Sequence, residues 1–272
     1  MKTFFAFIAD KFGKNEKFKV YGPHGGLSIE CTLPNGFDQE HDKCPMVVLM
    51  HGFISSKRMP PISYLTKSLA DAGIASISFD FDAHGKSEGD FIDMTISSEI
   101  LDAKAVYEYA RALPFVSDIA LLGHSQGGVV AGMLAGQLEE SDHKPKCLVQ
   151  LAPAAVLKDD AIAGQCMGKK YDAANPPAYV NVFFHKLGRN FILEAQQLPI
   201  YETSYKYSGP VCILHGTNDK IVPLDYSHKY NELYSSCELH TLEGEGHFMT
   251  KDKAQITTLI TSFLTKILLD KQ

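Results

Sequence analysis

The chain has 272 residues, of which 45% are hydrophobic, and its formal net charge is −6 at pH 7. This length and composition suffice for one large α/β core, with or without a small additional subdomain. The acidic balance and the absence of a Lys/Arg run argue against a nucleic-acid partner. The sequence contains no stretch of 18 consecutive apolar residues, so no membrane span is predicted.

Residues 1–17 form an N-terminal extension that begins MKTFFAFIADKFG. An amphipathic helix is predicted there, whose apolar side would carry Phe4, Phe5, Ile8 and Phe12. An exposed apolar side on this helix would permit, but would not require, packing against a second copy of the chain in a homodimer. Asp10 and Lys11 interrupt the apolar run and no small-residue cleavage site follows, which favours a cytoplasmic protein over a secreted one. The six cysteines include no C-x-x-C pair, so free thiols are expected.

After the extension, strand and helix patterns alternate along the chain. An opening hairpin is predicted at 18–22 and 27–33, around the turn PHGG. Short apolar runs predict further strands at 46–52, 74–81, 119–123, 147–153, 211–216 and 237–244. Helical patterns lie between or after them at 61–73, 95–113, 125–140, 223–236 and 256–270. This alternation predicts a mostly parallel sheet with helices on both faces.

One segment interrupts the alternation. Between Pro153 and Pro210 lie more than 50 residues without a clear strand pattern. Because a structureless loop of that length is uncommon in a compact domain, we predict an inserted, partly helical lid at 154–207. The core would then comprise 18–153 and 208–272. Large insertions of this kind often carry substrate recognition.

The stretch GHSQG, residues 123–127, fits the pattern G-x-S-x-G. It follows a predicted strand and opens a predicted helix, which is the context of a nucleophile elbow. Gly123 and Gly127 would let the backbone turn sharply and let strand and helix approach closely. Ser125 is therefore the predicted nucleophile. The alternative is a serine that only caps a helix N-terminus.

A serine hydroxyl needs a base within reach, and the base needs an orienting group. On this architecture the expected chain order is Ser, acid, His. Asp219 follows the strand at 211–216 and His247 follows the strand at 237–244, so both fall at the sheet edge where Ser125 lies. We predict that Asp219 orients His247 and that His247 accepts the Ser125 proton. The alternatives are a turn aspartate and a surface histidine.

Two backbone N–H groups are expected to bind the oxyanion of the tetrahedral intermediate. One belongs to Gln126, directly after the nucleophile. The other is assigned to Phe53, in the loop HGF that follows a strand. The sequence contains no HExxH, no clustered Cys and His, and no G-x-G-x-x-G, so neither a metal nor a cofactor is expected.

Several motifs resemble those of the bacterial cinnamoyl (feruloyl) esterases of the α/β-hydrolase superfamily: HGF, FDFDAHGKSEG, GHSQGGVVAGMLAG, LAPAAVLK, AQQLPIYE, PVCILHGTND and EGEGHF. The similarity runs from about Val20 to the C-terminus, and LAPAAVLK and AQQLPIYE are its most specific parts. It implies an α/β-hydrolase fold with an eight-stranded sheet. It also implies a serine carboxylesterase that releases hydroxycinnamic acids, such as ferulic, caffeic or p-coumaric acid, from small-molecule esters through an acyl-enzyme.

In that family the lid binds the ring hydroxyl of the acid, and Asp160 matches the acidic residue involved. The alternative is that Asp159 and Asp160 form a solvated acidic doublet. Phe191 stands where the family carries a lid tyrosine, and Met167 where it carries a lid glutamine. Both changes remove hydrogen-bond partners, so specificity would be broader or shifted. Other lid residues that could supply a hydroxyl are Tyr179, Tyr201 and Tyr205.

The same residues fit other activities on this scaffold. These are a broad-specificity short-chain or aryl esterase, a monoacylglycerol lipase-like hydrolase and a small peptidase. A ligand receptor that has lost turnover would be expected to break the triad or the oxyanion loop, and both are intact here.

Overall fold

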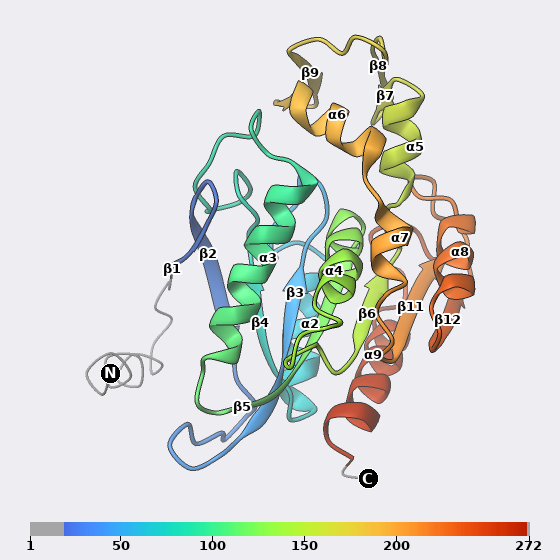
Figure 1. Ribbon diagram of the computed structural model, residues 1–272. Helices are drawn as coiled ribbons and strands as arrows, with labels where there is room; N and C mark the ends of the chain where they lie inside the picture. Colours follow the sequence, from blue (N-terminus) through green and yellow to red (C-terminus); the bar gives the residue numbers. More distant parts are fainter. Residues whose placement is uncertain (1–18, 271–272) are drawn as a thin grey trace.

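The computed structural model describes residues 19–270, so the helix expected in the N-terminal extension lies outside the described residues. At its centre is an eight-stranded sheet with the order β1-β2-β4-β3-β5-β6-β11-β12 (Figure 1). The strands are β1 Lys19–Gly22, β2 Gly25–Thr32, β3 Cys44–Met50, β4 Ala75–Phe79, β5 Val116–His124, β6 Leu148–Leu151, β11 Val211–Gly216 and β12 Cys237–Leu242. β1 and β2 form the predicted antiparallel hairpin, β2 is antiparallel to β4, and the remaining neighbours are parallel. The predicted α/β-hydrolase architecture is confirmed.

Helices cover both faces of this sheet. They are α2 Ile62–Asp71, α3 Ile96–Arg111, α4 Gln126–Gln137, α8 Asp225–Leu233 and α9 Lys253–Leu268. The central strand β3 shows how the faces are separated. Val47 and Leu49 belong to the core cluster that contains α2 and α9, whereas Met46 and Val48 belong to the cluster that contains α3 and α4. Because all four side chains are fully buried, the strand is apolar throughout rather than alternating.

The segment between β6 and β11 forms a separate group of elements, above the sheet in Figure 1. It contains α5 Val156–Ile162, α6 Arg189–Gln197 and α7 Ile200–Ser204. It also contains two antiparallel pairs, β7 Gln165–Cys166 with β8 Lys169–Lys170 and β9 Tyr179–Val182 with β10 His185–Gly188. The sequence showed no clear strand here because strands of two to four residues are too short for a periodic pattern. α5 lies against α6, and α7 packs on α4 of the core.

The junction between β5 and α4 is unusually tight. Ser125 has φ 57° and ψ −122°, and α4 begins at the next residue. A Cβ atom on Gly123 would lie 2.0 Å from the carbonyl oxygen of Gly127, and one on Gly127 would lie 2.3 Å from the carbonyl oxygen of His51. Both glycines are therefore required by the close approach of strand, helix and neighbouring loop. The predicted strand–turn–helix is present.

Two further observations concern the cysteines and the length and hydropathy of the helices. All six cysteines are free thiols, as predicted. Within residues 19–270, no helix combines the length and the hydropathy needed to cross a membrane.

Gly123→Ala is expected to destabilise the fold, because its methyl group would overlap the backbone of Gly127. Overpacking of this kind lowers the free energy of unfolding by roughly 1–3 kcal/mol. Urea unfolding at equilibrium measures the change. Gly246→Ala is the matched control, since a Cβ atom there meets nothing within 4 Å. Equal midpoints for the two variants would contradict the proposed role of the tight junction.

Candidate active site

Three polar side chains meet beyond the carboxyl ends of three parallel strands. Ser125 follows β5, Asp219 follows β11 and His247 follows β12. His247 Nε2 lies 2.9 Å from Ser125 Oγ, and His247 Nδ1 lies 2.7 Å from Asp219 Oδ2. An ionised carboxylate only accepts hydrogen bonds, so Nδ1 carries the proton and Nε2 is left to accept from the serine hydroxyl. The structure thus brings together the three residues singled out in the sequence.

Asp219 is held as an anion although its side chain is only 1% exposed. Burial alone would raise its pKa, but hydrogen bonds from His215 and His247 and the charge of His247 outweigh burial and hold the pKa below its usual range. The backbone N–H groups of Ile221 and Val222 donate to the other carboxylate oxygen, at 2.8 and 2.9 Å. The acid is therefore fixed in position as well as in charge.

His215 is a supporting residue that the sequence analysis did not identify. It is fully buried near the end of β11, and its Nε2 lies 3.3 Å from Asp219 Oδ2 and 3.0 Å from the carbonyl oxygen of Val222. Nε2 therefore donates, and Nδ1 accepts from the Ser227 hydroxyl at 2.6 Å. The signal was its place in LHGTND, four residues before Asp219.

The two candidate oxyanion residues lie beside the serine. Phe53 and Gln126 line the same pocket as Ser125. A Cβ atom on Gly52 would stand 2.9 Å from the Cβ of Ser125, so the loop after β3 passes directly against the serine. Because Gln126 is the first residue of α4, its N–H group also lies at the positive end of a helix dipole.

Two buried histidines shape the loop that carries Phe53. His51 Nδ1 donates to the carbonyl oxygen of Gly52 at 2.8 Å, and His51 Nε2 accepts from the N–H of Phe81 at 3.1 Å. Burial, together with the neighbouring His84, lowers the pKa of His51 to about 3. The ring is therefore neutral, as its accepting nitrogen requires. His84 Nε2 accepts from the N–H of Ile54 at 3.2 Å, on the other side of the loop.

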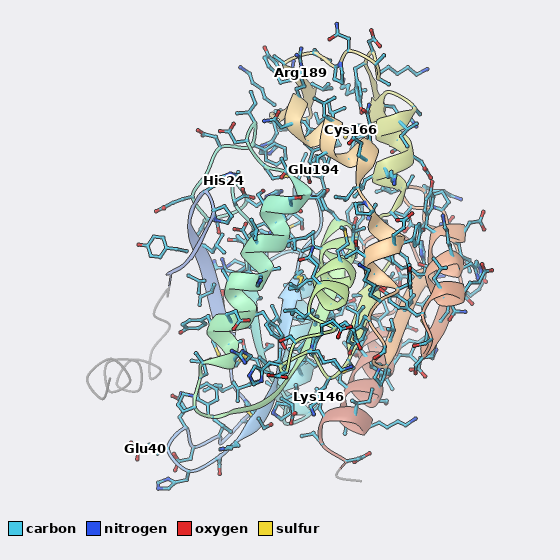
Figure 2. All side chains as sticks on the ribbon, viewed as in Figure 1. His24, Glu40, Lys146, Cys166, Arg189 and Glu194 are labelled. Carbon is cyan, nitrogen blue, oxygen red and sulfur yellow. The ribbon has the colours of Figure 1, made fainter. Side chains whose placement is uncertain are left out.

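A group of buried carboxyls lies behind Gln126. The side-chain Nε2 of Gln126 donates to Glu99 at 2.8 Å. Burial and the nearby Asp82 raise the pKa of Glu99 well above its usual value. The same two causes raise the pKa of Asp102 to about 8. Asp102 accepts from the N–H of Asp82 at 2.8 Å, and Asp82 pairs with His24, labelled in Figure 2. Gln126 is thus anchored from behind, by residues that the sequence analysis did not identify.

The pocket in front of Ser125 has a volume of about 340 Å³ and extends into the insertion. Asp160, Met167 and Phe191 all line it, as does Cys166, which Figure 2 labels beside α5 and α6. The three substrate-binding candidates therefore lie in one cavity with the serine.

Hydrogen bonding separates the two neighbouring aspartates. Asp160 Oδ1 accepts from Gln165 Nε2 at 2.7 Å inside the pocket, whereas Asp159 accepts from the Tyr226 hydroxyl at 2.6 Å and does not line it. Among the described residues, the tyrosine that lines the pocket is Tyr171. The three tyrosines considered from the sequence, Tyr179, Tyr201 and Tyr205, do not line it.

Comparison with known proteins also indicates a hydrolase. The family model described as serine aminopeptidase, S33 (Hydrolase_4) matches residues 41–190. The human protein ABHD12B is 30% identical over 71% of this chain and 50% of its own length. The mouse mitochondrial palmitoyl-protein thioesterase ABHD10 is 25% identical over 84% of this chain and 77% of its own. The chain therefore spans half the length of the first of these relatives.

The chain is also similar to a solved structure of Est1E from Butyrivibrio proteoclasticus with ferulic acid bound. The TM-score is 0.86 and the sequence identity 29%, and the match covers 92% of this chain and 98% of that one. Because the match covers nearly all of both chains, it includes the insertion as well as the core.

Asp102→Asn is expected to reduce the pH dependence of folding stability. The pKa of Asp102 rises from its usual 3.8 to about 8 in the folded protein. Between these values the folded state holds a proton that the unfolded chain has lost, so the free energy of unfolding falls as pH rises from about 4 to about 8. Asparagine does not titrate and can still accept from the Asp82 N–H group.

Urea unfolding at about pH 5 and about pH 8 measures this difference. The wild type should lose more stability between the two conditions than Asp102→Asn does. Asp142→Asn, at an exposed position, is the control and should follow the wild type. A variant at Asp102 with the wild-type pH dependence would show that this carboxyl is ionised in the folded state.

Proposed function

Because the chain belongs to the serine aminopeptidase S33 family of α/β-hydrolases, we propose that it is a serine carboxylesterase acting on esters of hydroxycinnamic acids. The observation that carries the proposal is the contact between His247 Nε2 and Ser125 Oγ, at the floor of a pocket that also contains Asp160.

The proposed reaction is a two-step acyl transfer. Ser125 Oγ attacks the ester carbonyl carbon while His247 Nε2 accepts the hydroxyl proton, and Asp219 stabilises the resulting imidazolium. The N–H groups of Gln126 and Phe53 bind the oxyanion. His247 then gives the proton to the leaving alcohol, which departs and leaves an acyl-serine. A water molecule then attacks the acyl carbon while His247 Nε2 accepts its proton, and His247 gives that proton to Ser125 Oγ as the acid is released.

The insertion supplies the contacts proposed for the acid. In this proposal the Asp160 carboxylate accepts a hydrogen bond from a ring hydroxyl. Two observations support it: Asp160 lines the pocket, and Gln165 Nε2 donates to its Oδ1. Phe191 and Met167 offer apolar surface for the ring. The cavity of about 340 Å³ is near the lower end of the range for small-molecule sites, roughly 300–1,000 Å³, which favours a compact acid over a long acyl chain. The similarity to a structure that holds ferulic acid supports the same choice.

A broader aryl or short-chain esterase is the second candidate. By the resemblance, Met167 and Phe191 stand at positions where the cinnamoyl esterases carry hydrogen-bonding side chains. Phe191 offers a buried hydroxyl no hydrogen-bond partner, and Met167 offers only a weak sulfur acceptor. A pocket that lacks such a partner discriminates weakly between hydroxylated and unhydroxylated acids. The two candidates therefore differ in substrate range and share one mechanism.

Hydrolysis of methyl ferulate, methyl cinnamate and p-nitrophenyl butyrate tests the proposal directly. We expect the wild type to hydrolyse methyl ferulate and Ser125→Ala to lose that activity by roughly 10³-fold or more. Serine-dependent activity on the butyrate alone would replace the hydroxycinnamate proposal with the second candidate. Activity that persists in Ser125→Ala would refute the mechanism.

Asp160→Asn is expected to reduce the preference for a hydroxylated ring. Methyl p-coumarate and methyl cinnamate differ only by the ring hydroxyl, so the ratio of their kcat/KM values isolates that contact. Loss of a hydrogen bond to a charged group should lower the ratio by roughly 10-fold or more.

Asp159→Asn is the matched control, because Asp159 accepts from Tyr226 and does not line the pocket. It should leave the ratio unchanged. If both variants lower the rates for the two esters equally, the acidic pair supports the local structure of α5 and does not bind the ring.

A further inference from the structure

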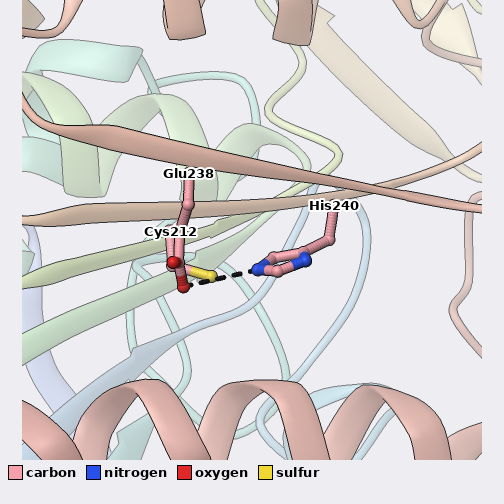
Figure 3. Close-up of side chains that lie close together, drawn as sticks. All are labelled: Cys212, Glu238 and His240. Atoms are coloured by element: carbon pink, nitrogen blue, oxygen red, sulfur yellow. Dashed lines mark ion pairs between the residues drawn. The ribbon is translucent and has the colours of Figure 1, made fainter.

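Three side chains of metal-binding type meet at the β12 edge of the sheet. Cys212 lies near the start of β11, and Glu238 and His240 lie on β12. A sulfur, a carboxylate oxygen and a ring nitrogen from these residues all lie within 4.8 Å of one another. Figure 3 shows the three side chains pointing toward a common point, and Glu238 Oε1 lies 3.3 Å from His240 Nε2. Among the described residues, no other three His, Cys, Asp or Glu side chains bring ligand atoms this close.

The strand register explains why these side chains converge. Cys212 is paired with Glu238, and Leu214 with His240, in a parallel ladder. Residues paired in this way point to the same face of the sheet. That face is packed by α9, because Cys212 and Leu214 belong to the core cluster that also contains Ile260. Glu238 and His240 therefore occupy positions on a face whose inner part is apolar.

A groove of about 800 Å³ adjoins these two residues. It is lined by Glu238 and His240 of β12 and by Phe263, Lys266 and Ile267 of α9. It shares no lining residue with the pocket in front of Ser125. An ion and its water would thus be accessible from solvent without passing through the ester site.

Protection of the sheet edge is the simpler explanation for charged residues on β12. It accounts for exposed charges along an outer strand. It does not account for a carboxylate and an imidazole that both turn toward a fully buried thiol. Glu238 already pairs with His240 and with the Cys212 thiol, and the same three donor types on one point form a set that a thiophilic cation would bind.

We propose that Cys212, Glu238 and His240 bind a single thiophilic divalent cation of the Zn²⁺ class, with water completing the coordination. Sulfur and imidazole donors select Zn²⁺ over Mg²⁺ or Ca²⁺, which require oxygen ligands. Bonds of roughly 2.0–2.3 Å place tetrahedral ligand atoms roughly 3.3–3.8 Å apart. The 3.3 Å between Glu238 Oε1 and His240 Nε2 already fits, and the separations from Cys212 Sγ, which are within 4.8 Å, need to close by about 1 Å at most. The Glu238 and His240 side chains are 50% and 32% exposed and are free to rotate that far. The thiol proton leaves to solvent on binding.

The cation would join β12 to β11 in addition to their backbone hydrogen bonds. β12 leads into the loop that carries His247, so the site fixes one support of the proposed active site without entering the reaction. A cation that binds only the folded state raises the stability of that state by mass action.

Titration of the full-length, chelator-treated protein with Co²⁺ tests this proposal. We expect saturation at one equivalent and a near-ultraviolet thiolate-to-cobalt band that Zn²⁺ removes. Cys212→Ser should abolish the band. Glu238→Gln and His240→Gln should each weaken the apparent Kd for Co²⁺ by roughly tenfold or more. The matched controls are Cys31→Ser, on β2, and His228→Gln, exposed on α8, and both should bind as the wild type does.

Three results would overturn the proposal: no thiolate band, a band that survives Cys212→Ser, or a band that Cys31→Ser removes. Hydrolysis of p-nitrophenyl butyrate and circular dichroism verify that each variant is folded. If Cys212→Ser fails to fold, Glu238→Gln decides the question, because half of its side chain is exposed and the substitution keeps its shape. An unchanged Kd in that variant refutes the site.

Discussion

The close contact of β5, α4 and the loop after β3 is the constraint on which the candidate site depends. Ser125 adopts a positive φ, a conformation that disfavours residues with a Cβ atom by roughly 1–2 kcal/mol. Its backbone is fixed by four hydrogen bonds: its N–H donates to Leu151, and its carbonyl oxygen accepts from Gly128, Val129 and Ala154. The strain is therefore held by neighbouring elements, and it places the hydroxyl at the start of a helix, facing the pocket. Any side chain at Gly123 or Gly127 would separate these elements and move the serine.

Two buried carboxyls near this serine have pKa values that are shifted in opposite directions, and the number of hydrogen-bond donors that each receives explains the difference. Asp219 receives donors from two histidines and two backbone N–H groups, and its pKa falls. Glu99 receives a single amide donor and lies near other carboxyls, and its pKa rises. Burial and the nearby His247 lower the pKa of His124 to about 3, so its ring is neutral and donates to the His247 carbonyl oxygen at 2.8 Å. Asp219 is thus kept as a buried anion beside the histidine that would become positively charged during the reaction.

The sequence predicted the parts of the site that depend on strand order and local motif. Ser125, Asp219 and His247 each follow an apolar strand, and the carboxyl ends of parallel strands share one sheet edge, so their proximity could be inferred. Glu99 could not be found in this way, because it reaches Gln126 from the first turn of α3 and only tertiary packing brings them together. The cluster at Cys212 was hidden for the same reason, since no short spacing links Cys212 on β11 to Glu238 and His240 on β12. The hairpins of the insertion were missed because their strands are too short to show a period.

The aromatic ring at residue 191 also has a structural role. The Phe191 ring centroid lies 6.0 Å from that of Phe53, which in turn lies 5.7 Å from that of Phe91. Phe191 is 5% exposed and belongs to α6 of the insertion, whereas Phe53 belongs to the loop beside Ser125. An apolar ring at 191 therefore joins the insertion to the loop proposed to hold the oxyanion. Aromatic pairs of this kind contribute about 0.5–1.5 kcal/mol beyond the area that they bury. A hydroxyl placed in this contact would need a hydrogen-bond partner, and the phenylalanine rings do not offer one. The position of Phe53 therefore depends in part on the side chain at residue 191.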